Sequence, residues 1–187
     1  MDKNHQIIDE YGEWISERRR NGWDGYFLTF MFNQLRGNRG GRLIQMEKEV
    51  ERVYATLLTR VVREPTHEKS KDQLPRWIIC PDLPVPKRER MSLREATVND
   101  GLHLQGIGLF PARSRLKEPL DQHFSEHQDL YVKVGGPLRS VAATPIIATP
   151  KRMVEYGFKA IPRRTASFDD VLILPRALSE IKDQQMQ

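Results

Sequence analysis

The sequence predicts an α+β fold in which a small, largely antiparallel sheet is covered by helices on one face. Helix-like and strand-like segments alternate irregularly along the chain, and short apolar runs recur between them. The 187 residues suffice for one hydrophobic core without disulfides or structural metal. We expect an N-terminal helical extension at residues 1–22, a central domain at residues 23–162 and a C-terminal extension at residues 163–187. The open face of such a sheet would be available to a ligand.

Four segments have the periodicity or the end signals of helices. Residues 3–20 carry apolar side chains at helical spacing and end before Asn21 and Gly22. Shorter helices are expected at residues 119–131 and at residues 150–161, where Pro150 lies in the first turn. The clearest apolar stripe belongs to the helix expected at residues 42–65, and it consists of Leu43, Met46, Val50, Val53, Leu57 and Val61.

Four apolar runs have the length and composition of strands, at residues 25–32, 76–80, 102–110 and 140–150. The segments between them are polar or rich in glycine and proline, as expected for loops. The runs are too short to span a membrane, and the charged N-terminus does not resemble a signal peptide. The single cysteine, Cys80, excludes an intramolecular disulfide framework. We therefore expect a cytoplasmic protein.

The net charge of +5 permits nucleic acid as a partner without requiring it. Basic residues cluster in the glycine-rich loop "LRGNRGGR", and a further pair occurs at Lys151 and Arg152. In the loop, Arg36, Arg39 and Arg42 could contact DNA phosphates, and Lys151 and Arg152 are further candidates for DNA contacts. A solvated basic surface explains each of these clusters equally well.

A polar pair interrupts the apolar run at residues 102–110. His103 and Gln105 project from the same face of a strand, because side chains alternate between faces. An imidazole nitrogen and an amide oxygen can both ligate a divalent cation, and the oxygen favours Mg²⁺ or Mn²⁺. An acidic ligand would complete such a site, and Asp82, Glu95 and Asp100 are close in sequence. A solvated strand face is the alternative reading of the pair.

A second pair, Tyr156 and Lys159, lies in the predicted helix at residues 150–161. Residues three apart share one face of a helix, so the phenol and the ammonium would be neighbours. A phenol can attack a phosphodiester, while an ammonium can neutralise the phosphate or help to deprotonate the phenol. Alternatively, Tyr156 is a packing residue with a solvated tip.

Three motifs, in this order, resemble those of HUH-type endonucleases, and the rolling-circle replication initiator branch in particular. They are "YFLTFMF" (residues 26–32), "HLQG" (residues 103–106) and "YGFK" (residues 156–159). The resemblance implies a five-stranded antiparallel, RRM-like sheet, with the metal pair on a central strand and the nucleophile helix below it. Because only four strands are evident in the sequence, the fifth is expected within residues 90–100 or 168–174.

The resemblance also implies an activity. His103 and Gln105 would hold Mg²⁺ or Mn²⁺, Gln105 standing where a second histidine is commoner. Tyr156 would attack single-stranded DNA at an origin or hairpin, leaving a 5′-phosphotyrosyl link and a free 3′-hydroxyl, and Lys159 would assist. Thr29 would have an architectural role. A site-specific nickase and ligase of this kind serves replication or transfer of a plasmid, phage or transposable element, and unwinding is expected from a host helicase.

Two other functions fit the sequence. The first is a non-catalytic protein that binds single-stranded nucleic acid with the sheet and its basic rim. The second is a zinc hydrolase that uses "HFSEH", in which His123 and His127 share a helix face and Glu126 could act as a base. A solvated helix face with Leu120, Phe124 and Leu130 turned inward is the alternative reading of that motif.

Overall fold

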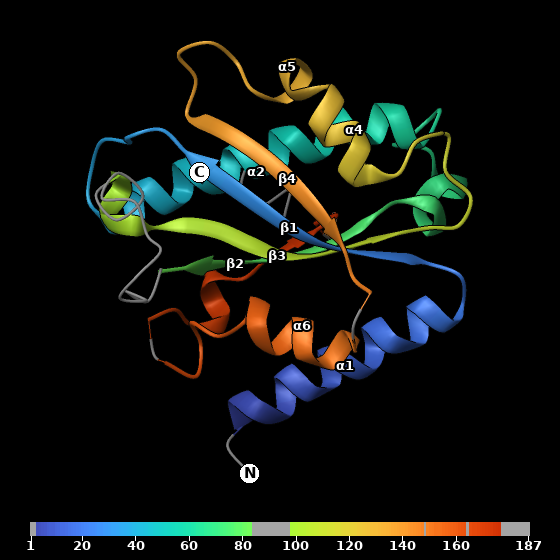
Figure 1. Ribbon diagram of the computed structural model, residues 1–187, viewed down its shortest axis with the longest axis horizontal. Coiled ribbons are helices and arrows are strands. Elements are labelled where there is room, and N and C mark those ends of the chain that lie inside the picture. Colours follow the sequence, from blue (N-terminus) through green and yellow to red (C-terminus); the bar gives the residue numbers. More distant parts are fainter. Residues whose placement is uncertain (1–2, 84–97, 148, 164, 177–187) are drawn as a thin grey trace.

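Five strands form one antiparallel sheet in the order β4-β1-β3-β2-β5. The computed structural model describes residues 3–83, 98–147, 149–163 and 165–176 (Figure 1). The predicted α+β class is confirmed, and the fifth strand lies in the second of the two expected segments. The strands are β1 (Asp24–Phe32), β2 (Arg76–Asp82), β3 (His103–Phe110), β4 (Leu138–Pro145) and β5 (Leu172–Leu174).

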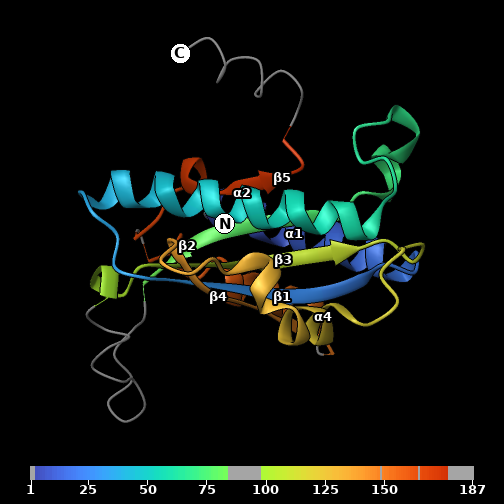
Figure 2. The same ribbon diagram turned by 90° about the horizontal axis from the view of Figure 1, so that it is seen from above.

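Helices cover both faces of the sheet, so the prediction of one open face was wrong. In Figure 1, α2 (Arg39–Val61), α4 (Leu120–Glu126) and α5 (Gln128–Tyr131) lie above the sheet, while α1 (Lys3–Arg20) and α6 (Pro150–Gly157) lie below it. Figure 2 shows that α2 runs along the length of the sheet. Two separate apolar clusters explain the double cover, because the central strands carry buried apolar side chains on both faces.

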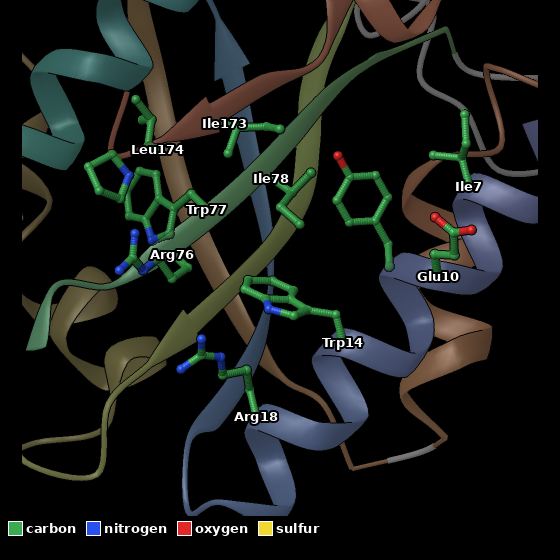
Figure 3. Close-up of a pocket in the computed structure, with 11 residues that line it drawn as sticks. Ile7, Glu10, Trp14, Arg18, Arg76, Trp77, Ile78, Ile173 and Leu174 are labelled. Carbon is green, nitrogen blue, oxygen red and sulfur yellow. The ribbon is translucent and has the colours of Figure 1, made fainter. Parts of the chain in front are cut away.

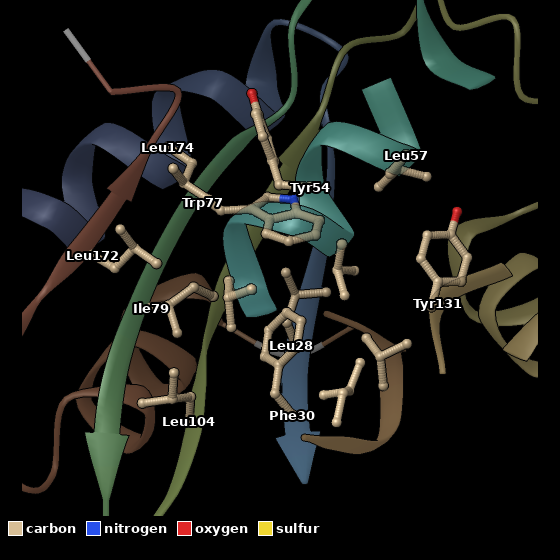
Figure 4. Packing of buried hydrophobic residues seen from close by; sticks show 14 of the residues in the cluster. Leu28, Phe30, Tyr54, Leu57, Trp77, Ile79, Leu104, Tyr131, Leu172 and Leu174 are labelled. Carbon is tan, nitrogen blue, oxygen red and sulfur yellow. The ribbon is translucent and has the colours of Figure 1, made fainter. Parts of the chain in front are cut away.

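The larger apolar cluster lies between the sheet and α2 (Figure 4). The Trp77 ring contacts Phe30 and Tyr54 at centroid distances of 5.7 and 5.0 Å, and Tyr54 Oη donates to Pro75 O at 2.7 Å. Each such aromatic pair is worth roughly 0.5–1.5 kcal/mol beyond its buried area. All six residues of the predicted α2 stripe are buried. The helix begins earlier than predicted because the Asn38 side chain accepts a hydrogen bond from Gly41 N at 2.9 Å and caps it.

The smaller apolar cluster joins α1 and α6 to the other face of the sheet. Tyr11 of α1 stacks on Phe158, which follows α6, at a centroid distance of 5.5 Å. α6 ends at Gly157, four residues earlier than predicted, and the predicted helix at residues 119–131 is divided at His127 into α4 and α5. Among the helices that the structure describes, none combines the length and the apolar character needed to cross a membrane.

Short 3₁₀ turns, η1 (Glu68–Gln73), η2 (Val98–Gly101) and η3 (Phe168–Asp170), lie between the main elements. The backbone of η2 passes through the left-handed region at Asn99 (φ 53°) and Asp100 (φ 56°). The buried Asn99 side chain accepts from Leu35 N at 2.8 Å and donates to Asn33 O at 2.8 Å. These bonds hold the turn that enters β3 against the chain that leaves β1.

Candidate active site

Three polar side chains converge on the α6 face of the sheet, at the end where β3 begins and β2 ends. The β2–β3 register pairs Asp82 with His103, so their side chains share a face with Gln105. His103 Nε2 lies 3.5 Å from Asp82 Oδ2, and Asp82 and Gln105 are only 2% and 3% exposed. The structure therefore supplies the acidic neighbour that the polar pair predicted.

The imidazole of His103 is oriented with its Nε2 towards Asp82. His103 Nδ1 lies 3.1 Å from Gly101 O, and a carbonyl can only accept, so Nδ1 carries the proton of the neutral ring. The lone pair of neutral imidazole is then on Nε2, facing the carboxylate. Metal-ligating histidines are commonly fixed in this way, by a hydrogen bond from the nitrogen that does not bind the metal.

Of the three acids close in sequence, only Asp82 reaches this site among the described residues. Asp100 is exposed and forms an ion pair with Arg42 Nη1 at 2.6 Å. Glu95 lies outside the described residues. Asp82 was not singled out from the sequence, because its position opposite His103 depends on strand register rather than on any local pattern.

The three side chains carry the types of ligand atom that a hard divalent cation accepts. Asp82 Oδ2 is buried and pairs with the Lys159 ammonium at 2.8 Å, so a cation bound here would share this oxygen with Lys159. Gln105 donates through Nε2 to Tyr156 O at 3.4 Å, which leaves its amide oxygen for a cation. Octahedral Mg²⁺ places adjacent ligand atoms about 3 Å apart, close to the 3.5 Å between His103 and Asp82. His103, Gln105 and Asp82 could thus hold Mg²⁺ or Mn²⁺.

Tyr156 lies in the last turn of α6, next to this polar cluster. Its side chain is 50% exposed, and its ring lies against Phe27 with the centroids 5.4 Å apart. Lys159 Nζ is 4.2 Å from the centroid of the Tyr156 ring and 2.8 Å from Asp82 Oδ2. One ammonium group therefore contacts both the phenol ring and the buried carboxylate.

The sequence predicted that Lys159 and Tyr156 share a helix, but α6 ends at Gly157, before Lys159. Lys159 lies in the following turn, and its backbone N donates to Tyr156 O at 3.4 Å. The same carbonyl accepts from Gln105 Nε2, which ties the end of α6 to β3. The turn still brings the two side chains together, so the predicted pair is present by a different local geometry.

The strands beside Gln105 bring backbone and side chains close together next to the polar cluster. Thr29 of β1 pairs with Gln105 and is half-buried, beside the cluster rather than within it. A Cβ on Gly106 would lie 1.9 Å from Ile78 O, so β2 and β3 approach here as only glycine allows. Gly157 of α6 lies over this point, with its own Cβ position 3.9 Å from Gly106 Cα.

The predicted DNA-contacting residues of the loop after β1 lie at the same end of the sheet as the polar cluster. Arg36 is exposed, whereas Arg39 donates through Nη2 to Thr165 O. Arg42 is committed to Asp100. Only part of this basic loop is therefore available to a phosphate without breaking an internal contact.

The predicted basic pair Lys151 and Arg152 lies at the start of α6. Lys151 Nζ contacts Asp9 Oδ1 of α1 at 2.8 Å, and this hydrogen bond raises the pKa of Lys151. Arg152 is exposed. The two side chains thus differ, because Lys151 joins α6 to α1 while Arg152 projects into solvent.

A pocket of about 600 Å³ lies between α1 and the strands β2 and β5 (Figure 3). Trp14 and Arg18 line it from α1, and Arg76 and Ile78 line it from β2. Arg18 lies over the Trp14 ring at 5.7 Å. Asp82 terminates the opposite end of β2 from Arg76, so this pocket is separate from the polar cluster.

Within the motif "HFSEH", His123 is buried and hydrogen-bonded on the α2 side of the sheet, while Glu126 is exposed. His123 is 3% exposed, its Nδ1 lies 2.6 Å from Glu118 Oε1 and its Nε2 lies 2.7 Å from Tyr131 Oη. The bond to His123 lowers the pKa of Glu118. Glu126, the base expected from the motif, is exposed and accepts from Gln122. Glu118 could not be identified from the sequence, because this residue precedes α4 and is not at helical spacing from His123 or His127.

Cys80 lies on β2, two residues before Asp82, and is fully buried. Burial, with a smaller contribution from the Asp82 charge, raises the pKa of its thiol to about 12. A thiol in this environment is protonated at neutral pH and has little nucleophilic character. Cys80 is therefore a packing residue of the smaller apolar cluster.

Comparison of the chain with protein-family models, with curated proteins and with solved structures finds no match. The resemblance of its three motifs to HUH-type endonucleases therefore stays a prediction. The arrangement of His103, Gln105, Asp82, Tyr156 and Lys159 is the observation from which a function can be inferred.

Proposed function

We propose that the protein is a metal-dependent endonuclease and strand transferase that acts on single-stranded DNA through Tyr156. The observation that carries this proposal is the contact of Lys159 Nζ with both Asp82 Oδ2 and the Tyr156 ring. Lys159 thereby joins an exposed phenol to the buried Asp82 carboxylate. That carboxylate faces His103 Nε2, while His103 Nδ1 bonds to Gly101 O. We further propose that the protein works in the cytoplasm, in the replication or transfer of a mobile genetic element.

Tyr156 is the nucleophile in the proposed reaction. A bond forms between its Oη and the phosphorus while the bond from phosphorus to O3′ breaks, which leaves a 5′-phosphotyrosyl link. The phenolic proton passes to water, and the departing O3′ takes a proton from water to become a hydroxyl. Attack by a 3′-hydroxyl on the phosphotyrosine reverses the steps and rejoins the strand, so that cleavage and ligation use the same groups.

Lys159 has an electrostatic role in this proposal. Its ammonium lies over the Tyr156 ring, where it favours negative charge on the phenol oxygen and on the phosphate that approaches it. The Lys159 ammonium is paired with the Asp82 carboxylate, which argues for charge stabilisation rather than proton abstraction. Gln105 positions the nucleophile by bonding to the backbone at Tyr156.

His103, Gln105 and Asp82 are the residues that would hold the divalent cation. Bound there, Mg²⁺ or Mn²⁺ would neutralise phosphate charge and polarise the P–O bond. The half-exposed position of Tyr156 leaves room for a strand to reach the nucleophile. Arg36 and Arg152 are the exposed candidates for phosphate contacts. Duplex DNA would require a separate helicase.

A covalent adduct assay tests the proposal. The protein is incubated with Mn²⁺ and a labelled pool of single-stranded oligonucleotides with randomised sequence, and adducts are separated under denaturing conditions. We expect an adduct with the wild type and none with Tyr156→Phe or with EDTA. Tyr11→Phe is the matched control, because it also loses only a hydroxyl and keeps its ring stacked on Phe158.

Two results would contradict the proposal. An adduct retained in Tyr156→Phe would assign the nucleophile to another residue. Salt-sensitive binding of the oligonucleotides without an adduct under Mg²⁺ or Mn²⁺ would instead favour the non-catalytic binding function.

A further inference from the structure

We propose that Glu118, His123 and His127 form a zinc site that fastens the segment after β3 to α4. One ligand atom of each residue lies within 4.8 Å of the other two. His123 projects from α4, His127 follows the end of α4, and Glu118 lies in the segment before it. The group belongs to the α2 side of the sheet, where Phe124 and Tyr131 are in the larger apolar cluster, so it is independent of the proposed nuclease site.

The donor set favours zinc over the hard cations. Two imidazoles and one carboxylate are a known ligand set for Zn²⁺, whereas Mg²⁺ prefers oxygen ligands and retains several waters. Tetrahedral zinc with bonds of about 2.0–2.1 Å places its ligand atoms about 3.3 Å apart. The contact of His123 Nδ1 with Glu118 Oε1, now 2.6 Å, would open slightly, and His127 would move inward. Glu118 and His127 are half-buried, so rotation of their side chains can supply these shifts.

Tyr131 supplies the outer support that a metal-ligating histidine needs. Its Oη lies 2.7 Å from His123 Nε2, so in the metal-bound form it can accept a hydrogen bond from Nε2–H and thereby direct the Nδ1 lone pair towards Glu118 and His127. The Tyr131 ring is fully buried and meets Phe124 edge-on at 5.0 Å. The oxygen that would orient His123 is therefore fixed by the core.

Without a metal, a proton occupies the position proposed for the zinc. Nδ1 of His123 and the Glu118 carboxylate oxygen are 2.6 Å apart, which requires a hydrogen between them. When Zn²⁺ binds Nδ1, the proton of the neutral ring moves from Nδ1 to Nε2, which then donates to Tyr131 Oη, and His127 becomes a third ligand. The ion would then tie the segment at residues 111–119 to α4, which lies on β4. Because His123 is almost inaccessible to solvent, the structure assigns the ion a structural role rather than the hydrolytic one suggested by the motif.

Metal titration of the full chain tests this site. Protein stripped with a chelator is titrated with Zn²⁺, and with Co²⁺ as a spectroscopic probe. We expect one zinc ion bound per chain at this site, a Co²⁺ absorption spectrum of tetrahedral type, and a rise in Tm of about 5–10 °C at a free zinc concentration of 100 Kd.

His127→Phe is the decisive variant, because it keeps a ring beside His123 but removes the ligand nitrogen. We expect it to weaken zinc binding at least tenfold and to leave the Tm of the metal-free protein nearly unchanged, since the Glu118–His123–Tyr131 bonds remain. Glu118→Gln should also weaken zinc binding. Glu126→Gln is the control, since this exposed carboxylate of the same motif should not affect it.

The proposal is overturned if wild type and His127→Phe bind zinc equally, or if His103→Ala rather than His127→Phe removes the Co²⁺ spectrum. It is also overturned if Zn²⁺ leaves the Tm unchanged, because the group is then a hydrogen-bonded network alone. Failure of the nuclease proposal leads to a different result, namely the absence of a DNA adduct while zinc binding through His127 persists.

Discussion

Replacing Asp82 with asparagine should destabilise the fold, because it removes the carboxylate that neutralises the ammonium of Lys159. The two groups are 2.8 Å apart, and their side chains are 2% and 20% exposed. Asp82→Asn preserves the size of the side chain, so the main change is the loss of charge. Lys159→Met makes the reciprocal change and leaves a buried carboxylate whose remaining ion-pair partner, among the described residues, is His103.

The expected loss of unfolding free energy follows from how deeply the Asp82–Lys159 ion pair is buried. Breaking a fully buried ion pair by removing one partner costs about 3–5 kcal/mol, whereas an exposed pair contributes about 1 kcal/mol or less. Because the Lys159 side chain keeps some access to water, we expect Asp82→Asn to lower the free energy of unfolding by about 2–3 kcal/mol. For a chain of this length, that corresponds to a fall in Tm of about 4–12 °C.

Urea unfolding, followed by circular dichroism in EDTA, measures this cost in the two single variants and in the double variant Asp82→Asn/Lys159→Met. We expect a coupling free energy of about 1–3 kcal/mol, so the double variant should be more stable than the sum of the single losses predicts. Glu68→Gln and Lys71→Met form the control cycle, because that ion pair is exposed and should show coupling below about 0.5 kcal/mol. Additive effects of the Asp82 and Lys159 substitutions would refute the inferred contact.

Three further predictions test the site and its supports. Asp82→Asn should weaken Mn²⁺ binding, measured by electron paramagnetic resonance, by more than the roughly 10–100-fold typical of a residue that only supports a ligand; an unchanged Kd would remove Asp82 from the metal site. Gly106→Ala should destabilise the fold by about 3 kcal/mol or more, because its Cβ would collide with Ile78 O. Gly157→Ala meets only ordinary contacts and should stabilise α6 by up to about 1 kcal/mol, and thermal unfolding of the two variants tests this difference. The Cys80 thiol should react at pH 8 with a disulfide reagent about a thousandfold more slowly in the folded than in the unfolded protein, because burial raises its pKa to about 12 and suppresses the thiolate until strongly alkaline pH; equal rates would contradict this.

Most helices and strands could be predicted from the sequence because their signals are local. The apolar stripe of α2 and the apolar runs of the four longer strands follow from the repeat of the backbone itself. The ends were less predictable. α6 stops at Gly157 where the predicted helix continued to Ile161, and α2 begins earlier because Asn38 caps it. β5 has only three residues, too few for periodicity to identify it.

In the candidate site, too, the contacts between residues close in sequence could be predicted, and the contact between different strands could not. His103 and Gln105 were predicted to share a face because residues two apart in a strand do so whatever surrounds them. Tyr156 and Lys159 were predicted to be neighbours because they are three residues apart, although a turn rather than a helix brings them together. Asp82 could not be selected from the three nearby acids, because its place opposite His103 is set by the β2–β3 register.

The sequence by itself determined the fold class, the faces of the individual strands and helices, and the two local residue pairs, since all of these depend on the geometry of a few consecutive residues. Only the tertiary structure decided that helices cover both faces of the sheet, that Lys159 joins Asp82 to Tyr156, and that Glu118 rather than Glu126 accompanies His123. These contacts join residues from different elements. They depend on strand register and on the packing of two apolar clusters, and neither leaves a pattern within a short stretch of sequence.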